Sequence, residues 1–246
     1  MLLPETSSRQ VPVNKLVKDA AEAVADIGDG AAIMSGGFGL CGNPENLIQA
    51  LHDRGVKGLT LISNNCGTTD DGLGLLLKAG QVERMVASYV GENKVFEEQY
   101  LSGKLAVELV PQGTLAERIR AGGAGIGGFY TRAGVGTEAA RGKETRVLDD
   151  GHEYVLEKPL KADFALVHAY KADTWGNLVF RKTARNFSPL MCTAARVTVV
   201  ECEHLVGVGE IDPDQIHVPS IYVHRLFQGA GFQKWIERRT VRRRSG

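Results

Sequence analysis

The sequence is poor in cysteine, and its cysteines are not spaced as metal ligands. Among 246 residues there are only four, and no two of them form a CxxC pair. Structural disulfides and zinc sites generally need more cysteines at closer spacing. We therefore expect free thiols, no metal site and a reducing compartment, the cytoplasm. The four are Cys41, Cys66, Cys192 and Cys202.

The sequence also lacks an excess of charge and any long apolar run. Lys plus Arg and Asp plus Glu both total 29, so no overall charge attracts nucleic acid or an anionic membrane. No apolar run approaches the roughly 18 residues that a membrane helix needs. We expect neither nucleic acid nor a membrane as partner. The arginine-rich end "ERRTVRRRSG" is typical of a solvated terminus or, alternatively, of a tail that docks an anionic partner.

What remains is an ordinary globular composition with one unusual stretch. The chain contains 43% hydrophobic and 24% charged residues, as an ordinary globular domain does. We therefore treat residues 1–246 as a single domain. The unusual stretch is a glycine loop, "GGFGLCG" at residues 36–42. The run "AAIM" before it predicts a buried strand, and Asn43 and Pro44 predict a helix N-cap and first helical residue. The loop's N–H groups suit a phosphate, carboxylate or thioester oxygen, unless its glycines only permit tight packing.

The order of strand, loop and helix recurs along the first half of the chain. A helix is predicted first, from an N-cap at Asn14 to Ile27. Asp70 and Asp71 are expected to cap a later helix. The alternation predicts an α/β fold, an open, mostly parallel sheet with helices on both faces. Beyond the glycine loop, strands are expected at 59–63, 82–90 and 105–110, and helices at 71–80, 94–103 and 114–122.

The loops after these strands are expected to form one rim, because parallel strands end at the same edge of a sheet. The rim carries the amides of Asn64, Asn65, Asn93 and Gln112, and Glu92 is its one carboxylate. Amides and backbone N–H groups donate hydrogen bonds, so the rim suits binding an anion or polarising a carbonyl. The loops span residues 36–42, 64–67, 91–93 and 111–113.

The second half is predicted to be less regular. Seven glycines between Gly122 and Gly136 indicate a long loop. Strands rich in valine and aromatic residues are expected at 162–170, 195–202 and 219–225, and the stretch 173–190 interrupts them.

The sequence also contains a possible dinucleotide-binding motif, possible cysteine nucleophiles and a possible zinc site, and the context of each disfavours that interpretation. Residues 123–128 match GxGxxG, but a helix precedes them, whereas a dinucleotide loop must leave a strand. Cys41 and Cys66 lie in rim loops, yet no histidine is near them in sequence to act as a base. In "ECEH", residues 201–204, alternate side chains point to opposite faces of a strand and cannot together bind zinc.

Several motifs together resemble the family I coenzyme A transferases, specifically the small A-type subunit of the succinyl-CoA:3-ketoacid type. The similarity runs from about Lys15 to Arg242 with the motifs in the family's order. Because several long motifs agree, it is more specific than any single glycine pattern. The motifs are "DGAAIMSGGFGLCGNP", "SNNCG", "SYVGEN", "PQGTLAERIRAGGAGIG", "FRKTARNF" and "IYVHR".

The resemblance implies a ping-pong transfer of CoA from succinyl-CoA to a 3-oxoacid such as acetoacetate. The nucleophilic glutamate of this family lies in a separate B subunit, so the chain is expected to be inactive alone. A heterodimer or an A2B2 heterotetramer is implied, with coenzyme A as a substrate and no tightly bound cofactor. Three alternatives remain open: the A subunit of a 3-oxoadipate CoA-transferase, a sugar-phosphate isomerase or sensor on a related fold, and a stand-alone binding module.

The resemblance also assigns roles to individual residues. Asn64 and Gln112 match residues near the reacting carboxylate and are predicted to support catalysis. The predicted substrate-binding residues are Asn65, Glu92 and Asn93. The predicted CoA-binding loop consists of Gly36, Gly37, Phe38, Gly39, Leu40, Cys41 and Gly42.

Overall fold

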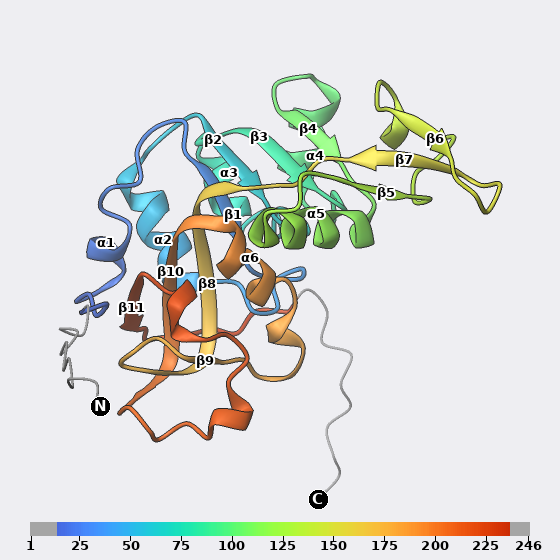
Figure 1. The fold of residues 1–246 in the computed structure, drawn as a ribbon. Helices are drawn as coiled ribbons and strands as arrows, with labels where there is room; N and C mark the ends of the chain where they lie inside the picture. Colours follow the sequence, from blue (N-terminus) through green and yellow to red (C-terminus); the bar gives the residue numbers. More distant parts are fainter. Residues whose placement is uncertain (1–13, 237–246) are drawn as a thin grey trace, which may run out of the picture.

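The centre of the molecule is an open sheet whose strands pair in parallel, except β9, which pairs antiparallel with β8 (Figure 1). The computed structural model describes residues 14–236, so the arginine-rich end at 237–246 lies outside the described residues. The strand order is β11-β10-β8-β1-β2-β3-β4. The prediction of an open, mostly parallel sheet is confirmed. The strands are β1 (Ala32–Ser35), β2 (Leu59–Ile62), β3 (Val82–Ala87), β4 (Ala106–Leu109), β8 (Ala162–Asp173), β9 (Leu178–Val179), β10 (Ala195–Val206) and β11 (Arg225–Gln228).

Helices cover both faces of this sheet, as predicted. Neighbouring strand residues point to opposite faces, so each strand contributes to two apolar layers. Ile33 and Leu61 join one buried cluster with side chains of α1 to α4. Met34 and Ile62 join a second cluster with side chains of α5 and α6. The helices are α1 (Ala20–Ala23), α2 (Glu45–Arg54), α3 (Gly74–Lys78), α4 (Lys94–Leu101), α5 (Gln112–Ala124) and α6 (Ser188–Ala194).

The direction of winding reverses at β1. This strand pairs with β2 on one side and with β8 on the other, so successive strands move outward in opposite directions. In open α/β sheets, ligands bind outside the carboxyl ends of the strands at such a reversal. The glycine loop at 36–42 leaves β1 at this point, which places it where a ligand is expected.

The first helix is shorter than predicted. It spans only Ala20–Ala23, and its N-cap is Asp19, not Asn14. The residues before it are extended, because the Val17 N–H donates to Leu226 O at the edge of the sheet, 3.0 Å away. Pairing with the sheet therefore overrides the helical periodicity of this segment.

The start of α2 also differs from the prediction. Its N-cap is Pro44, not Asn43, and no side chain of the N-cap bonds to the helix. The Leu47 N–H in its first turn instead donates to the Glu201 carboxylate of β10, with N and Oε2 2.9 Å apart. A residue far along the chain thus satisfies one of the unpaired N–H groups of this helix.

The predicted aspartate cap of α3 is wrong. The N-cap is Leu73, which bonds no N–H through its side chain. Asp70 pairs with Lys78 at 2.6 Å, and Asp71 accepts a hydrogen bond from the Thr68 hydroxyl at 3.3 Å. Both carboxylates are thus engaged by neighbours other than the helix N–H groups.

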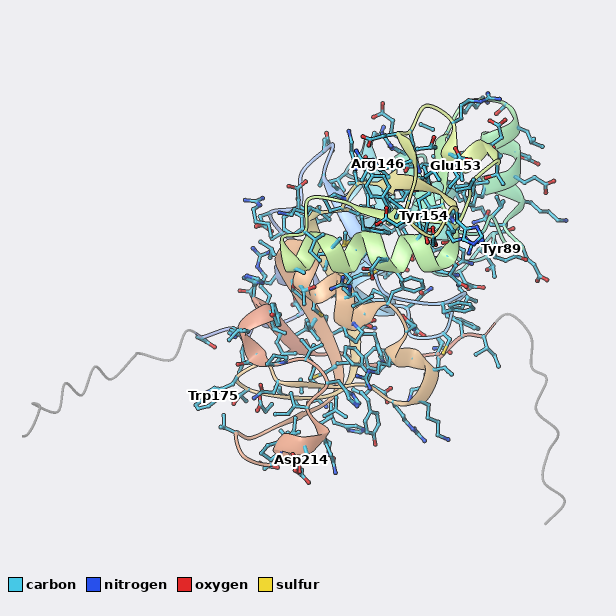
Figure 2. The ribbon with its side chains drawn as sticks, turned by 45° about the vertical axis from the view of Figure 1, so that its right-hand side comes forward. Tyr89, Arg146, Glu153, Tyr154, Trp175 and Asp214 are labelled. Carbon is cyan, nitrogen blue, oxygen red and sulfur yellow. The ribbon has the colours of Figure 1, made fainter. Side chains whose placement is uncertain are left out.

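The glycine-rich stretch is more regular than predicted. α5 continues through Gly122 and Gly123, which confirms the helical context that argued against a dinucleotide loop. Beyond it, an antiparallel sheet with strand order β5-β7-β6 extends to one side of the molecule (Figure 1). Figure 2 shows Arg146, Glu153 and Tyr154 on this small sheet. Its strands are β5 (Phe129–Thr131), β6 (Thr145–Val147) and β7 (Glu153–Glu157).

The strand predicted at 219–225 is wrong. Within this stretch Ser220–Tyr222 form a 3₁₀ turn, and β11 begins only at Arg225. The interruption predicted at 173–190 holds β9, a 3₁₀ turn and the start of α6. The 3₁₀ turns are η1 (Glu138–Ala140), η2 (Lys182–Arg185), η3 (Pro213–Gln215) and η4 (Ser220–Tyr222).

Close packing explains the glycines at the end of α5. A Cβ on Gly122 would lie 1.8 Å from Leu160 O, and one on Gly123 would lie 2.0 Å from Thr193 Oγ1. At these two glycines the backbone of α5 therefore packs directly against Leu160 and Thr193. Gly113, near the start of the same helix, has nothing within 4 Å of its Cβ position.

We expect Gly122→Ala to destabilise the fold although alanine is the better helix former. The clash with Leu160 O should cost about 1–3 kcal/mol in the free energy of unfolding. Gly113→Ala is the matched control, and it should be neutral or stabilise by up to about 1 kcal/mol. Urea unfolding of both variants tests the prediction, and equal effects at the two positions would contradict it.

Candidate functional site

A cavity of about 690 Å³ lies at the carboxyl ends of β1 to β4. The rim predicted from the sequence is therefore present, because each of its four loops contributes to the cavity wall. Six of the lining residues are predicted site residues, and Ser88, Tyr89 and Ile236 are additional. The lining residues are Phe38, Gly39, Asn64, Asn65, Ser88, Tyr89, Glu92, Gln112 and Ile236.

Asn64 and Gln112 form a hydrogen-bonded pair of amides in this cavity. Gln112 Nε2 donates to Asn64 Oδ1 at 2.7 Å. Asn64 is nearly fully buried after β2, and Gln112 is the exposed first residue of α5. Because Asn64 accepts this bond through its oxygen, its Nδ2 donors are left for other partners. The pair offers neutral hydrogen-bond donors in a partly desolvated place.

Close packing accounts for part of the glycine loop. A Cβ at Gly37 would lie 1.9 Å from Asn43 Oδ1, and one at Gly42 would lie 2.8 Å from Ala184 O. Both glycines also have positive φ, 132° and 79°. Side chains larger than glycine are therefore excluded at these two positions by the protein itself.

Asn186 ties this loop to the segment before α6. Its Oδ1 accepts from the Gly37 N–H at 3.0 Å, and its Nδ2 donates to Cys41 O at 3.1 Å. The Gly36 N–H continues the ladder of the sheet and donates to Leu166 O at 3.0 Å. These bonds hold the base of the loop, which is buried and does not line the cavity.

The tip of the loop is a tight turn directed at the cavity. Phe38 and Cys41 exchange two backbone hydrogen bonds of 3.1 Å, with Gly39 at φ 59° between them. In the described chain the N–H groups of Gly39, Leu40 and Gly42 have no hydrogen-bond partner. The Phe38 side chain is 50% exposed and lines the cavity. The tip therefore combines unpaired N–H groups with an exposed aromatic ring.

The predicted substrate-binding residues divide between the cavity and the interior. Asn65 and Glu92 line the cavity. Asn93 is 1% exposed and does not; its Oδ1 accepts from the Phe96 N–H at 3.0 Å as the N-cap of α4. Its Nδ2 donates to Cys66 O at 2.9 Å. Asn93 therefore stabilises the loop by hydrogen bonds in the protein interior.

The rim cysteines do not have the surroundings of nucleophiles. Cys66 is fully buried, and burial raises the pKa of its thiol to about 12. Cys41 lies outside the cavity, with its Sγ 3.5 Å from the Thr183 hydroxyl. Within the described residues, neither thiol has a base as partner. The geometry agrees with the expectation that this chain carries no cysteine nucleophile.

A charged network that is buried at one end lies behind the glycine loop. His168 of β8 bonds Glu201 through Nδ1 at 3.0 Å and Glu203 through Nε2 at 3.2 Å, and Lys234 pairs with Glu203 at 2.6 Å. Burial alone would lower the pKa of His168, but the two carboxylates outweigh it and the pKa is raised. Burial raises the pKa of Glu201. The two acidic residues of "ECEH" do share a face, as predicted.

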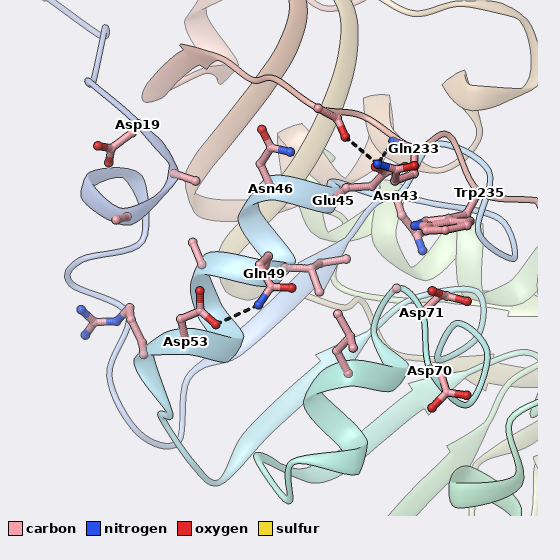
Figure 3. Close-up of a pocket in the computed structure, with 18 residues that line it drawn as sticks. Asp19, Asn43, Glu45, Asn46, Gln49, Asp53, Asp70, Asp71, Gln233 and Trp235 are labelled. Atoms are coloured by element: carbon pink, nitrogen blue, oxygen red, sulfur yellow. Dashed lines mark hydrogen bonds between the residues drawn. The ribbon is translucent and has the colours of Figure 1, made fainter.

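A larger cavity, of about 790 Å³, lies beside α2 and α3 and contains no predicted site residue (Figure 3). Its lining holds several carboxylates, including Asp19, Asp53 and Asp70. Between residues 14 and 236, no group of three His, Cys, Asp or Glu side chains could hold a metal ion. Within the same range, no helix is long and apolar enough to cross a membrane.

Three cavity residues were missed by sequence reasoning. The strand predicted through Val90 ends at Ala87, so Ser88 and Tyr89 belong to the rim. The rule that strand ends form the rim would have found both with the correct boundary. Ile236 had no local signal, because it reaches the cavity only through the path of the chain after β11. Figure 2 shows Tyr89 beside one end of α5.

Comparison with known sequences relates this chain to the coenzyme A transferases. The Coenzyme A transferase family matches residues 17–229. The A subunit of a probable succinyl-CoA:3-ketoacid coenzyme A transferase of Bacillus subtilis is 58% identical over 234 residues, covering 95% of this chain and 98% of that protein. The A subunit of the succinyl-CoA:3-ketoacid coenzyme A transferase of Helicobacter pylori strain J99 is 53% identical over 230 residues, covering 94% and 99%.

Solved structures share the fold at lower identity. An acyl-CoA transferase from E. coli O157:H7 aligns with a TM-score of 0.77 and 20% identity, covering 87% of this chain and 47% of that chain. This chain thus spans about half of the E. coli chain. Glutaconate coenzyme A-transferase from Acidaminococcus fermentans aligns with a TM-score of 0.74 and 19% identity, covering 87% and 75%.

We expect His168→Gln to lower the free energy of unfolding by an amount that shrinks as the pH rises. In the folded protein the pKa of His168 is raised above 6.5, its ordinary value in an unfolded chain. Protonated His168 therefore stabilises the fold fully at pH values below 6.5. This stabilisation is lost as the pH rises through the raised pKa. Urea unfolding at about pH 6 and about pH 9 checks it. His204→Gln, exposed on the other face of β10, is the control; a pH-independent effect of His168→Gln would contradict the prediction.

Proposed function

The chain belongs to the coenzyme A transferase family, and we propose that it is the A subunit of an enzyme that moves CoA from succinyl-CoA to a 3-oxoacid. Relatives that share more than half of its residues over nearly their whole length carry this name. The observation that carries the proposal is the pair of neutral amides, Asn64 and Gln112, in the cavity at the carboxyl ends of the strands.

The composition of the cavity supports a division of labour between two subunits. Among the described residues that line it there is no histidine, cysteine or lysine, and Glu92 is the one carboxylate. A site with donors but no paired nucleophile and base stabilises charge and does not supply the attacking group. We therefore propose that the partner is a B subunit, in a heterodimer or an A2B2 heterotetramer, and that it contributes the reacting glutamate.

In the proposed reaction, the partner's glutamate attacks the thioester carbonyl of succinyl-CoA and CoA thiolate leaves, giving a mixed anhydride. The thiolate then attacks the glutamyl carbonyl and releases succinate, giving a glutamyl-CoA thioester. The 3-oxoacid carboxylate repeats the two steps in reverse and departs as its CoA thioester. Each attack places negative charge on a former carbonyl oxygen, where hydrogen-bond donors stabilise it.

This chain's residues take supporting roles in those steps. Asn64 Nδ2 and Gln112 donate to the developing oxyanion or to the carboxylate that replaces it. The unpaired N–H group of Gly39, which lines the cavity, contacts CoA beside the exposed ring of Phe38. The four cysteines are free thiols, which suits the cytoplasm as the place of the reaction.

We expect the isolated chain to be inactive and the two-subunit enzyme to be active. The test is co-expression with a B-type subunit of this family, followed by an assay for acetoacetyl-CoA formed from succinyl-CoA and acetoacetate. A second assay with 3-oxoadipate shows which acid is preferred. CoA transfer by the purified single chain would contradict the division of labour.

We expect Asn64→Ala and Gln112→Ala to lower kcat by roughly tenfold to a thousandfold in the assembled enzyme, because each removes a donor used in the transition state. Gln49→Ala is the control, since Gln49 bonds Asp53 on α2, away from the cavity. Size-exclusion chromatography confirms that all variants assemble. Unchanged kcat in an assembled Asn64 or Gln112 variant would remove that residue from the mechanism.

A further inference from the structure

The chain after β11 returns across the carboxyl edge of the sheet toward the cavity. We call residues 229–236 the strap. Its Trp235 lines the larger cavity beside α2 and a small one of about 160 Å³ behind the glycine loop. Its Ile236 lines the site cavity. Figure 3 shows Gln233 and Trp235 lying over the start of α2.

The first turn of α2 fastens the strap through backbone bonds. Asn46 accepts from the Ala230 N–H at 2.9 Å and donates to Ala230 O at 3.1 Å. The Glu45 carboxylate accepts from the N–H groups of Gln233 at 2.7 Å and Lys234 at 2.8 Å. These bonds join side chains of α2 to backbone groups of the strap. They therefore fix the path of its main chain, whichever side chains the strap carries.

The charged network behind the glycine loop fastens the strap a second time. Lys234 Nζ lies 2.6 Å from Glu203 Oε2, and Glu203 is in turn bonded to His168. The Phe232 ring meets the His168 ring edge to face, with centroids 4.7 Å apart. Two side chains of the strap are therefore held against β8 and β10, which directs the following residues toward the cavity.

Large apolar and aromatic side chains line the cavity together with its amides. Ile236 is 46% exposed, Phe38 50% and Tyr89 60%, and all three line it. Half-exposed apolar side chains beside hydrogen-bonding amides are the usual composition of a small-molecule site, in which the polar groups fix orientation and the apolar ones contact the rest of the ligand.

We propose that the strap is a specificity element whose Ile236 forms the apolar wall against the acyl chain of the accepting acid. The inference rests on the proposed function, because Asn64 and Gln112 hold the acid's carboxylate in the same cavity. Glu45, Asn46 and Glu203 are positioning residues that keep this wall in place. Acids with larger acyl chains are then limited by the space between Ile236 and the amides.

Substitution of Ile236 in the assembled two-subunit enzyme tests the wall. Ile236→Trp should lower kcat/KM for 3-oxohexanoate relative to acetoacetate by about tenfold or more, and Ile236→Ala should raise this ratio by about threefold to tenfold. Ile221→Trp and Ile221→Ala, in η4 and outside the cavity lining, are matched controls and should leave the ratio unchanged. KM for succinyl-CoA is measured in parallel.

Substitution of Glu45 tests the fastening. Glu45→Ala removes the acceptor of two strap N–H groups, so it should shift the acid ratio in the direction of Ile236→Ala. It should also speed hydrogen exchange at residues 233–234. Glu98→Ala, exposed on α4, is the control and should do neither. Rapid exchange in the variant with an unchanged acid ratio would overturn the link between strap and selectivity.

The outcomes separate the two proposals. An active complex whose acid ratio is the same in wild type, Ile236→Trp and Ile236→Ala overturns the strap's role and leaves the proposed function standing. A change confined to KM for succinyl-CoA also overturns it, because Ile236 then contacts the CoA side. A wild-type complex that moves no CoA to any 3-oxoacid overturns the proposed function and this inference with it.

Discussion

The arrangement of the site depends on one fully buried carboxylate, that of Glu201. It bonds the Leu47 N–H at the start of α2 and His168 on β8, and so joins the helix after the glycine loop to two central strands. Burying a carboxylate costs several kcal/mol unless its partners are well placed. These partners lie on different elements, and the pairing therefore fixes how the elements sit together. The glycine loop and the strap are both attached to that framework.

One part of the glycine loop serves packing, and another part serves ligand access in the proposed function. Gly37 and Gly42 are required because Asn43 and Ala184 leave no room for a Cβ. In the turn between Phe38 and Cys41, the N–H groups of Gly39 and Leu40 have no hydrogen-bond partner within the described chain. The two interpretations that composition alone left open are thus not exclusive. In the proposed function, the rigid base holds the tip where a thioester oxygen or phosphate reaches it.

Sequence patterns predicted those features of the fold that depend on residues close together in the chain, such as the order of strands, loops and helices. Strand, loop and helix in sequence were enough to bring Asn64 and Gln112 to one rim. The predictions were wrong where distant contacts override local preference: pairing with β11 keeps Val17 extended, and the passage of Leu160 beside α5 keeps glycines within a helix. Alternation in β10 correctly placed Glu201 and Glu203 on one face. Their partner could not be predicted, because His168 lies opposite Glu201 only through the pairing of β8 with β10.

Neutral amides suit the proposed reaction, in which the site is shared with a partner that supplies the nucleophile. A lysine or arginine beside the partner's glutamate would form an ion pair with it, stabilising the ground state and reducing its nucleophilicity. The neutral donors of Asn64 and Gln112 gain most when charge moves onto the former carbonyl oxygen. Their mutual bond at 2.7 Å also orients them before substrate arrives, so little reorganisation is needed during the reaction. In the proposed division of labour, a half-site built this way is inert by itself and becomes effective only when another chain supplies the charge.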